Sequence, residues 1–306
     1  MEIPIQFCRM VLLLASVLTG GLACGSAQAQ AAEPGQPTVI WLSSYFAPVN
    51  VPVEGKPGDG IADRITEYVV AHWTQAQHQF VRANPTRIWH MLGQQASMCD
   101  TAALRTPERE KLAYFRDVFF SPPPQVILRP EALDRVRLNE QGQVDPVELM
   151  NNPDLRGVIV KQRAYGPAVD QVLRQPGGRL NVEQLASPNY GAGTLKMILL
   201  GRADYLIEYD ITLAYAITQD AALARLKVLP LKGAENFVVT GFACPRTPWG
   251  LATIRRIDAI LSTPEAAALI VNTELGALTS ATVARYGAQI RESVRRASVV
   301  DAERFR

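Results

Sequence analysis

Residues that build metal sites are scarce in this sequence. Its 306 residues include only three histidines and four cysteines, and the histidines (His72, His78 and His90) form no recognised metal-binding pattern. The sequence motifs of a nucleophile elbow, a phosphate-binding loop and a metalloprotease helix are also missing. We therefore predict no metal site, no cofactor and no catalytic residue.

An excess of charge of one sign is missing as well. The chain carries 31 Lys and Arg residues against 29 Asp and Glu residues, which is a formal net charge of +2 at pH 7. Proteins that bind nucleic acids or anionic membranes concentrate basic residues on one face. The balance argues against a nucleic-acid partner and favours a small molecule or a protein.

No apolar run reaches the ~20 residues that a membrane-spanning helix needs. The run at residues 11–18 follows Arg9 and is broken by glycines, and the cleavage pattern Ala27-Gln28-Ala29 comes next. This order predicts a secretory signal peptide at residues 1–29 and a location in the periplasm. Residues 21–24 offer an alternative, because they resemble a lipoprotein box in which Cys24 would be lipidated and would tether the protein to a membrane.

Two cysteines, Cys99 and Cys244, certainly remain after processing, because Cys8 lies in the predicted signal and Cys24 is either removed or lipidated. In an oxidising compartment an even pair of cysteines favours a disulfide, which we predict here. Two buried, unpaired thiols are the alternative.

Short apolar runs that are typical of buried strands alternate with helical patterns along the rest of the chain. The runs lie at residues 38–42, 125–128, 157–161, 205–209, 228–231 and 237–244. Apolar faces at 61–69 and 195–199 predict helices, and Thr247 and Thr263, each followed by proline, predict two helix starts. This alternation indicates an α/β fold whose sheets are covered on both faces. We expect residues 121–124 to cross between lobes, 138–152 to be a surface excursion, and 280–306 to be a charged helix with a frayed tail.

Two motifs carry a family resemblance. Thr106-Pro107-Glu108-Arg109 is followed by Phe119-Phe120-Ser121-Pro122, and this order resembles family 3 bacterial extracellular solute-binding proteins, the amino-acid-binding class. Three further elements follow in that family's order: residues 158–162, the stretch Gly201-Arg202-Ala203-Asp204, and a strand that ends near Cys244. The resemblance covers nearly all of the mature chain.

The resemblance implies a two-lobed type II periplasmic binding fold with two crossings between the lobes. Lobe one would combine residues 36–124 with 236–306, lobe two would be residues 125–235, and a small-molecule ligand would bind between them. The protein partner would be an inner-membrane ABC permease or a sensor receptor. We expect a monomer.

Arg109 is the strongest candidate for ligand binding in lobe one. Thr106 is a good N-cap and Pro107 a good first-turn residue, so Arg109 would project from a helix start. An arginine there can hold a carboxylate with two parallel hydrogen bonds. The alternative is that Arg109 pairs on the surface with an acidic neighbour, Glu108, Glu110 or Asp117.

The candidate site of lobe two departs from the family at two places. The turn that carries Arg163, Tyr165 and Gly166 stands where the family usually has a Gly-Thr or Gly-Ser pair, and Tyr209, next to Glu208, replaces an aspartate that commonly holds the ligand's ammonium group. A standard α-amino acid is therefore not expected, and Tyr209 suits a ring or an aliphatic acid. Arg163 is either a second contact to an anion or a solvated loop charge.

Three aromatic residues, Trp41, Tyr45 and Phe46, follow the first strand, where the family's cleft aromatics occur. They would flank the ligand, or Trp41 would be core and the other two would cover a loop. An enzyme is the alternative function, because cyclohexadienyl dehydratases resemble the same fold and need a buried carboxyl group as acid. Glu208 or Glu108 would serve in that role. Our leading prediction is an exported protein that binds a small acidic molecule for uptake or sensing.

Overall fold

The computed structural model describes residues 37–51, 53–94, 97–160, 165–174, 181–185, 192–301 and 303–305. The predicted signal peptide, the candidate lipid site at Cys24 and the candidate ligand contact Arg163 all lie outside the described residues. None of the helices in the described part is both long and apolar enough to cross a membrane.

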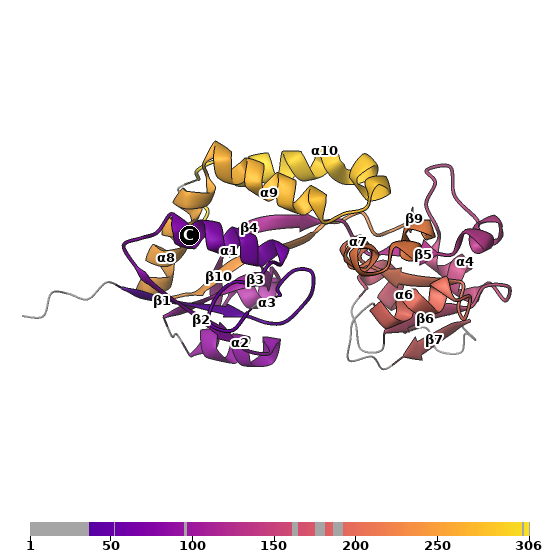
Figure 1. Ribbon diagram of the computed structural model, residues 1–306, viewed down its shortest axis with the longest axis horizontal. Helices are drawn as coiled ribbons and strands as arrows, with labels where there is room; N and C mark the ends of the chain where they lie inside the picture. The colour runs from indigo at the N-terminus through magenta and orange to yellow at the C-terminus, as the bar shows by residue number, and fades with distance from the viewer. Residues whose placement is uncertain are drawn as a thin grey trace, which may run out of the picture. The chain divides into compact units, whose positions relative to one another are not determined.

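The first of two sheets has the strand order β2-β1-β3-β10-β4 (Figure 1). Its strands are β1 (Thr38–Ser43), β2 (Gln77–Arg82), β3 (Met98–Leu104), β4 (Ala113–Ser121) and β10 (Val238–Pro245). β1 is parallel to β2 and β3, whereas β10 is antiparallel to both β3 and β4. The chain therefore returns to this sheet after more than 100 intervening residues, as the resemblance implies.

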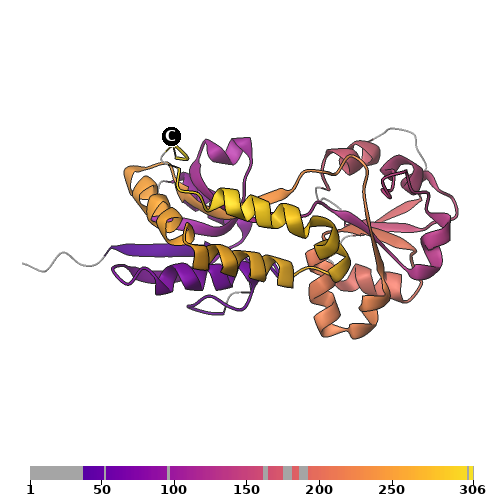
Figure 2. The same ribbon diagram turned by 90° about the horizontal axis from the view of Figure 1, so that it is seen from above.

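Helices cover both faces of the first sheet. Neighbouring residues of a strand point to opposite faces, so two consecutive residues of β1 show what packs on each side. Trp41 packs into a core with α1 (Ile61–Ala71), α8 (Pro248–Leu261), α9 (Pro264–Gly276) and α10 (Ser280–Ala297). The next residue, Leu42, packs on the other side against α2 (Pro85–Gly93). α9 and α10 lie side by side over the first of these cores (Figure 2).

The second sheet has the order β7-β6-β8-β5-β9. Its strands are β5 (Gln125–Leu128), β6 (Gly157–Val160), β7 (Val182–Leu185), β8 (Tyr205–Glu208) and β9 (Lys227–Pro230). Val126 and Ile207 pack toward α4 (Pro146–Asn151) and α5 (Pro167–Leu173), whereas Ile127 and Leu206 pack toward α6 (Ala192–Leu199) and α7 (Asp210–Gln219). Two short 3-10 helices, Pro130–Arg135 and Ala221–Arg225, complete this part. Burial on both faces explains why β5, β6 and β8 form largely apolar runs in the sequence.

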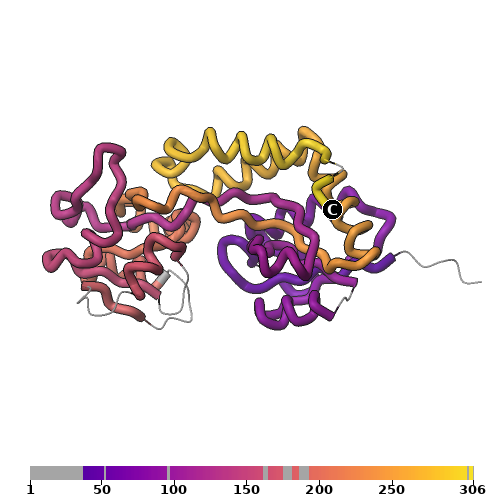
Figure 3. The backbone as a smooth tube through the Cα atoms, turned by 180° about the vertical axis from the view of Figure 1, so that it is seen from behind, coloured from indigo at the N-terminus to yellow at the C-terminus, as the bar shows by residue number. Residues whose placement is uncertain are grey.

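The chain crosses twice between the two sheets. β4 ends at Ser121 and β5 begins at Gln125, and the return runs from the end of β9 at Pro230 to Val238 in β10. Val238 pairs with Ser121 and Pro230 pairs with Gln125, so the two crossing segments lie side by side (Figure 3). These features confirm the predicted two-lobed α/β fold with two crossings.

Hydrogen bonds also join the second sheet's elements to the start of α10. The main-chain N–H and the hydroxyl of Thr279 donate to the carboxylate of Asp210 at 2.7 and 2.8 Å. The side-chain amide of Gln125 donates to the hydroxyl of Thr282 at 3.3 Å. The two contacts add polar connections to the chain crossings, and the second of them starts from Gln125, where the first crossing ends.

The predicted disulfide between Cys99 and Cys244 is present. Cys99 lies on β3, Cys244 lies on the neighbouring strand β10, and both side chains are fully buried. The bond therefore joins the two chain segments of the first sheet, which lie 145 residues apart in the sequence.

Three expectations about secondary structure are corrected. The apolar runs did not indicate β2, β3, β4 or β7. Two of these, β2 and β7, are edge strands with exposed polar positions that shorten the apolar pattern. The stretch 138–152 is not only a surface excursion, because Leu149 and Met150 are buried in the second lobe. The C-terminal tail is not frayed, because Arg304 forms an ion pair with Asp258 and Phe305 is buried.

The N-cap residue Thr247 allows a direct test of a helix start that was predicted from the sequence. Its hydroxyl accepts the N–H of Gly250 at 3.0 Å, as expected for the predicted helix start. Thr247→Ala should lower the free energy of unfolding by ~1 kcal/mol, and Thr247→Ser, which keeps the acceptor, should not. Urea unfolding of the two variants measures the difference; equal midpoints would show that the cap does not contribute.

Candidate functional site

The predicted site residues of the first lobe gather at one edge of its sheet. β1 and β3 are parallel, so their carboxyl ends point to the same edge, which is where open α/β sheets bind ligands. Tyr45 and Phe46 follow β1, and the short helix α3 (Pro107–Glu110) follows β3. Tyr45 is 57% exposed, and its ring centroid lies 5.2 Å from the guanidinium carbon of Arg82 at the end of β2. Tyr45 and Phe46 thus remain candidates for ligand contact.

Arg109 is held in place at this edge by three groups. The Thr106 hydroxyl accepts the main-chain N–H of Arg109 at 3.3 Å, so Thr106 is the predicted N-cap. The guanidinium carbon lies 4.5 Å from the ring centroid of Trp89, which comes from α2. Nη1 donates to the carbonyl of Leu104, the last residue of β3, at 2.9 Å. The side chain thus folds back from α3 to the carboxyl end of β3.

Arg105, and not Arg109, forms the ion pairs with the acidic neighbours Glu110 and Asp117. Arg105 donates to Glu110 and to Asp117, both at 2.6 Å. Glu108 is exposed, and hydrogen bonds from its own main chain and from the Thr106 hydroxyl hold its pKa below the ordinary value. Because a dehydratase acid needs a raised pKa, Glu108 does not suit that role.

A buried carboxylate, Asp100, lies close enough to Arg109 for the two charges to interact. Asp100 is in the middle of β3 and is 8% exposed, and its Oδ1 accepts the N–H of Ala102 at 3.1 Å. Burial raises the pKa of Asp100 to about 6, although that hydrogen bond and the charge of Arg109 act in the opposite direction. The sequence analysis missed Asp100; an acidic residue between the buried Cys99 and Thr101 was the available signal.

The second lobe shows the same geometry at its own parallel pair, β6 and β8. Gly166 follows β6 and begins α5 with φ of +90°, a conformation that favours glycine. Tyr165 is a core residue and not a ligand contact: it is 1% exposed, and its hydroxyl accepts the N–H of Val160 at 2.7 Å. Of that turn's described part, only Gly166 remains a site candidate.

Glu208 and Tyr209 lie at the carboxyl end of β8. The Glu208 carboxylate is buried and accepts the N–H of Tyr209 at 2.7 Å and the hydroxyl of Thr212 at 3.3 Å. The strand ends at Glu208, and Asp210 opens α7. Tyr209 is half-buried and packs against the core of the first lobe.

Trp41 is also corrected from ligand wall to core residue. It is 1% exposed, and its indole N–H donates to His78 at 3.0 Å. An indole whose polar atom is satisfied inside the protein has no group left at the surface for a ligand. We leave Trp41 out of the site.

No family model and no curated protein sequence matches this chain. Solved structures with a similar fold do match it. An ancestral cationic amino acid solute-binding protein is 14% identical over 80% of this chain and 96% of its own, with a TM-score of 0.61. The L-cystine solute receptor of Neisseria gonorrhoeae, in its unliganded open conformation, is 12% identical over 79% and 94%, with a TM-score of 0.53. The periplasmic VFT2 domain of BvgS from Bordetella pertussis is 16% identical over 77% and 92%, with a TM-score of 0.51. The chain has the type II periplasmic binding fold.

The described part of the chain also has pockets away from the carboxyl edges of the sheets. One of 360 Å³ is lined by the start of α1, by α7 and by the end of α9, and another of 550 Å³ by α7, β9 and the corner between α9 and α10. A third, of 320 Å³, lies in the second lobe around Arg135 and Glu148. None of the three is lined by a predicted site residue that the structure describes. The candidate site therefore rests on the carboxyl edges of the two sheets.

Proposed function

We propose that the protein is an exported, monomeric solute-binding protein that captures a small acidic molecule for uptake or sensing. The ligand would bind between lobe one (residues 36–124 and 236–306) and lobe two (residues 125–235), with Tyr209 and the turn at Gly166 closing on it. A permease or a receptor would recognise the closed form. The similar structures are named as binding proteins for amino acids or cystine, or as a periplasmic VFT domain, which supports a binding role over an enzymatic one.

The placement of Arg109 is the observation that carries this proposal. Among the described residues, its guanidinium makes one hydrogen bond to the protein, so N–H groups remain for a ligand. Stacking on Trp89 restrains the side chain before the ligand arrives, which lowers the entropy cost of binding. Each charge-assisted hydrogen bond to a carboxylate should contribute ~1.5–3 kcal/mol.

The carboxylates of lobe two favour an acidic ligand over an α-amino acid. An amino-acid ligand needs an acceptor for its ammonium group. Near the carboxyl end of β8, Glu208 already accepts from Tyr209 and Thr212, and Asp210 accepts from Thr279. Both carboxylates thus already accept hydrogen bonds from donors within the protein.

The test is a thermal-shift screen of carboxylic acids, cyclic acids and amino acids, followed by titration calorimetry of the best compound. Arg109→Ala should weaken its binding by tenfold or more, on the order of the loss of one charge-assisted hydrogen bond. Arg109→Lys should recover part of the affinity, because a point charge cannot replace the planar fork. Arg87→Ala is the control, since Arg87 is exposed on α2. A neutral or cationic best ligand, or unchanged binding by folded Arg109→Ala, would refute the proposal.

A further inference from the structure

Three consecutive residues at the start of α7 pack on the first lobe. Ile211 is 7% exposed and belongs to the buried core of that lobe, and Tyr209 packs against the same core. Between them, the buried carboxylate of Asp210 accepts the main-chain N–H of Thr279 at 2.7 Å and its hydroxyl at 2.8 Å. Lobe two is therefore held to lobe one by contacts that the two chain crossings do not provide.

The carboxylate of Asp210 is well placed at Thr279, because Thr279 is the N-cap of α10. This helix is 18 residues long, and the N–H groups at the start of a helix carry a partial positive charge that stabilises an anion. Both oxygens of Asp210 accept a hydrogen bond, as an ionised carboxylate does. Burial raises the pKa of Asp210, and the hydrogen bonds from Thr279 act in the opposite direction. Hydrogen bonds to a carboxylate are stronger than those between neutral groups.

Asp210 lies next to both the hinge and the ligand edge of lobe two. β8 ends two residues earlier at Glu208, whose register partner is Gln125, the residue at which the chain enters the second sheet. The side-chain amide of Gln125 donates to Thr282, which lies in the first turn of α10 beside Thr279. Groups close to a crossing move little when the lobes rotate about it. The contacts to the start of α10 can therefore persist while the lobes close.

Cavities border this contact, so few other residues support it. One of 360 Å³ and one of 550 Å³ are both lined by Ala214 of α7 and by Gly276 at the end of α9, and the larger one is also lined by Thr279. The middle of α7 is thus not closely packed on the corner between α9 and α10. The start of α7 carries the connection.

We propose that Asp210 is a positioning residue for ligand binding: through Thr279 it holds the ligand edge of lobe two in place on lobe one and sets the affinity without touching the ligand. The inference rests on the proposed function, since it concerns the same ligand. Tyr209, beside this contact, would move little, and the turn at Gly166 would make most of the closing motion. Without the contact the lobes would sample more orientations, and a ligand that has to restrict them binds more weakly.

The first experiment needs no ligand. Nitroxide labels are attached at Glu67→Cys on α1 and at Leu200→Cys beyond the end of α6, two exposed positions, and pulsed electron spin resonance measures the distance between them. The distance distribution should be broader in Asp210→Ala than in the labelled protein without that change. Thr279→Ser, which keeps the hydroxyl, should leave the distribution unchanged. Asp145→Ala is the matched control, because Asp145 caps α4 within lobe two.

An unchanged distribution in folded Asp210→Ala would overturn the inference and would leave the proposed function standing. If Asp210→Ala does not fold, Thr279→Ala decides in the same way. That variant keeps the main-chain hydrogen bond to Asp210 and loses only the one from the hydroxyl.

The second experiment uses benzoate, a ring carboxylate of the proposed ligand class, and titration calorimetry. Asp210→Ala should bind it about tenfold more weakly than the wild type, within the range typical of coupling between separate sites. Asp145→Ala should bind it as the wild type does. Saturating benzoate should narrow the distance distribution of Asp210→Ala to that of the wild type, which a purely structural role of Asp210 would not produce.

The outcomes separate the two ideas. A broader distribution together with unchanged affinity for benzoate overturns the positioning role of Asp210 alone. Benzoate that binds equally to the wild type and to Arg109→Ala, or to neither up to its solubility, counts against the proposed Arg109 clamp and removes the basis of the inference.

Discussion

Replacing both Cys99 and Cys244 by alanine should lower the free energy of unfolding by as much as ~5 kcal/mol. The bond closes a loop of 145 residues, and the entropy that this loop removes from the unfolded chain gives that figure as an upper value. The bond also holds β10 to β3, and β10 is the strand by which the chain returns to the first sheet.

Urea unfolding of the oxidised wild type and of the double variant measures this effect. The variant should unfold at a lower urea concentration and with a larger m value, because its unfolded chain is less compact. The matched control is the wild type reduced while unfolded and kept reduced, which should behave like the variant. Equal midpoints for oxidised and variant protein would show that the bond adds no stability.

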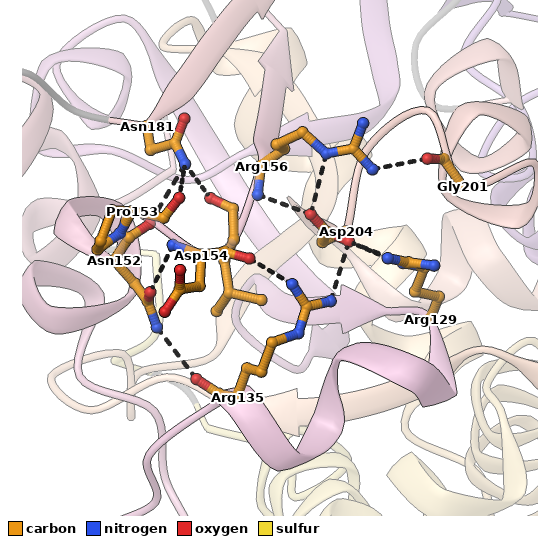
Figure 4. A network of polar contacts seen from close by, with 10 residues as sticks. Arg129, Arg135, Asn152, Pro153, Asp154, Arg156, Asn181, Gly201 and Asp204 are labelled. Carbon is orange, nitrogen blue, oxygen red and sulfur yellow. Dashed lines mark hydrogen bonds and ion pairs between the residues drawn. The ribbon is translucent and has the colours of Figure 1, made fainter.

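Replacing Asp204 by asparagine should lower the free energy of unfolding by about 3 kcal/mol, at the lower end of the loss seen when one partner of a buried charge network is removed. Figure 4 shows Asp204 surrounded by three arginines from separate parts of lobe two. Its Oδ1 accepts from Arg129 at 2.8 Å and from Arg135 at 3.2 Å. Its Oδ2 accepts from the main chain and from the side chain of Arg156, at 2.8 and 3.2 Å.

The pH dependence of this loss has a defined direction. Burial opposes ionisation of Asp204, but the hydrogen bonds from Arg156, Arg129 and Arg135 outweigh it and hold the pKa well below the ordinary value. A carboxyl group whose pKa is lower in the folded than in the unfolded protein stabilises the fold at pH values above its unfolded pKa. This stabilisation is lost as the pH falls toward the folded-state pKa. The difference between wild type and Asp204→Asn should therefore be constant from pH 8 to about pH 5 and shrink below about pH 4.

A matched control for Asp204 is Glu131→Gln. Glu131 pairs with Arg225 in the same lobe, but both side chains are half exposed, and such surface pairs are worth about 0–1 kcal/mol. If the two substitutions cost the same, the Asp204 network is no more than a surface ion pair. Because unfolding is followed by far-UV circular dichroism, a variant that fails to fold is recognised directly and agrees with the prediction.

The sequence by itself determined the features that depend on neighbouring residues. The helix starts at Thr106, Thr247 and Thr263 were predictable because a capping hydroxyl bonds to an N–H three residues away, whatever the rest of the chain does. Apolar runs predicted β1, β5, β6, β8, β9 and β10, and in β5, β6 and β8 burial on both faces accounts for the run. The two lobes and the two crossings were implied by the resemblance to family 3 solute-binding proteins, which rests on motifs such as Thr106-Pro107-Glu108-Arg109.

Only the tertiary structure decided which side chains are buried and which residues distant in the sequence are in contact. Trp41 lies within β1 and Tyr165 follows β6, and packing against helices buries both of these cleft candidates. The stacking of Arg109 on Trp89 depends on how α2 and α3 pack beside β3. No local pattern encodes this contact, because the two residues are brought together by the close packing of separate elements and not by their spacing.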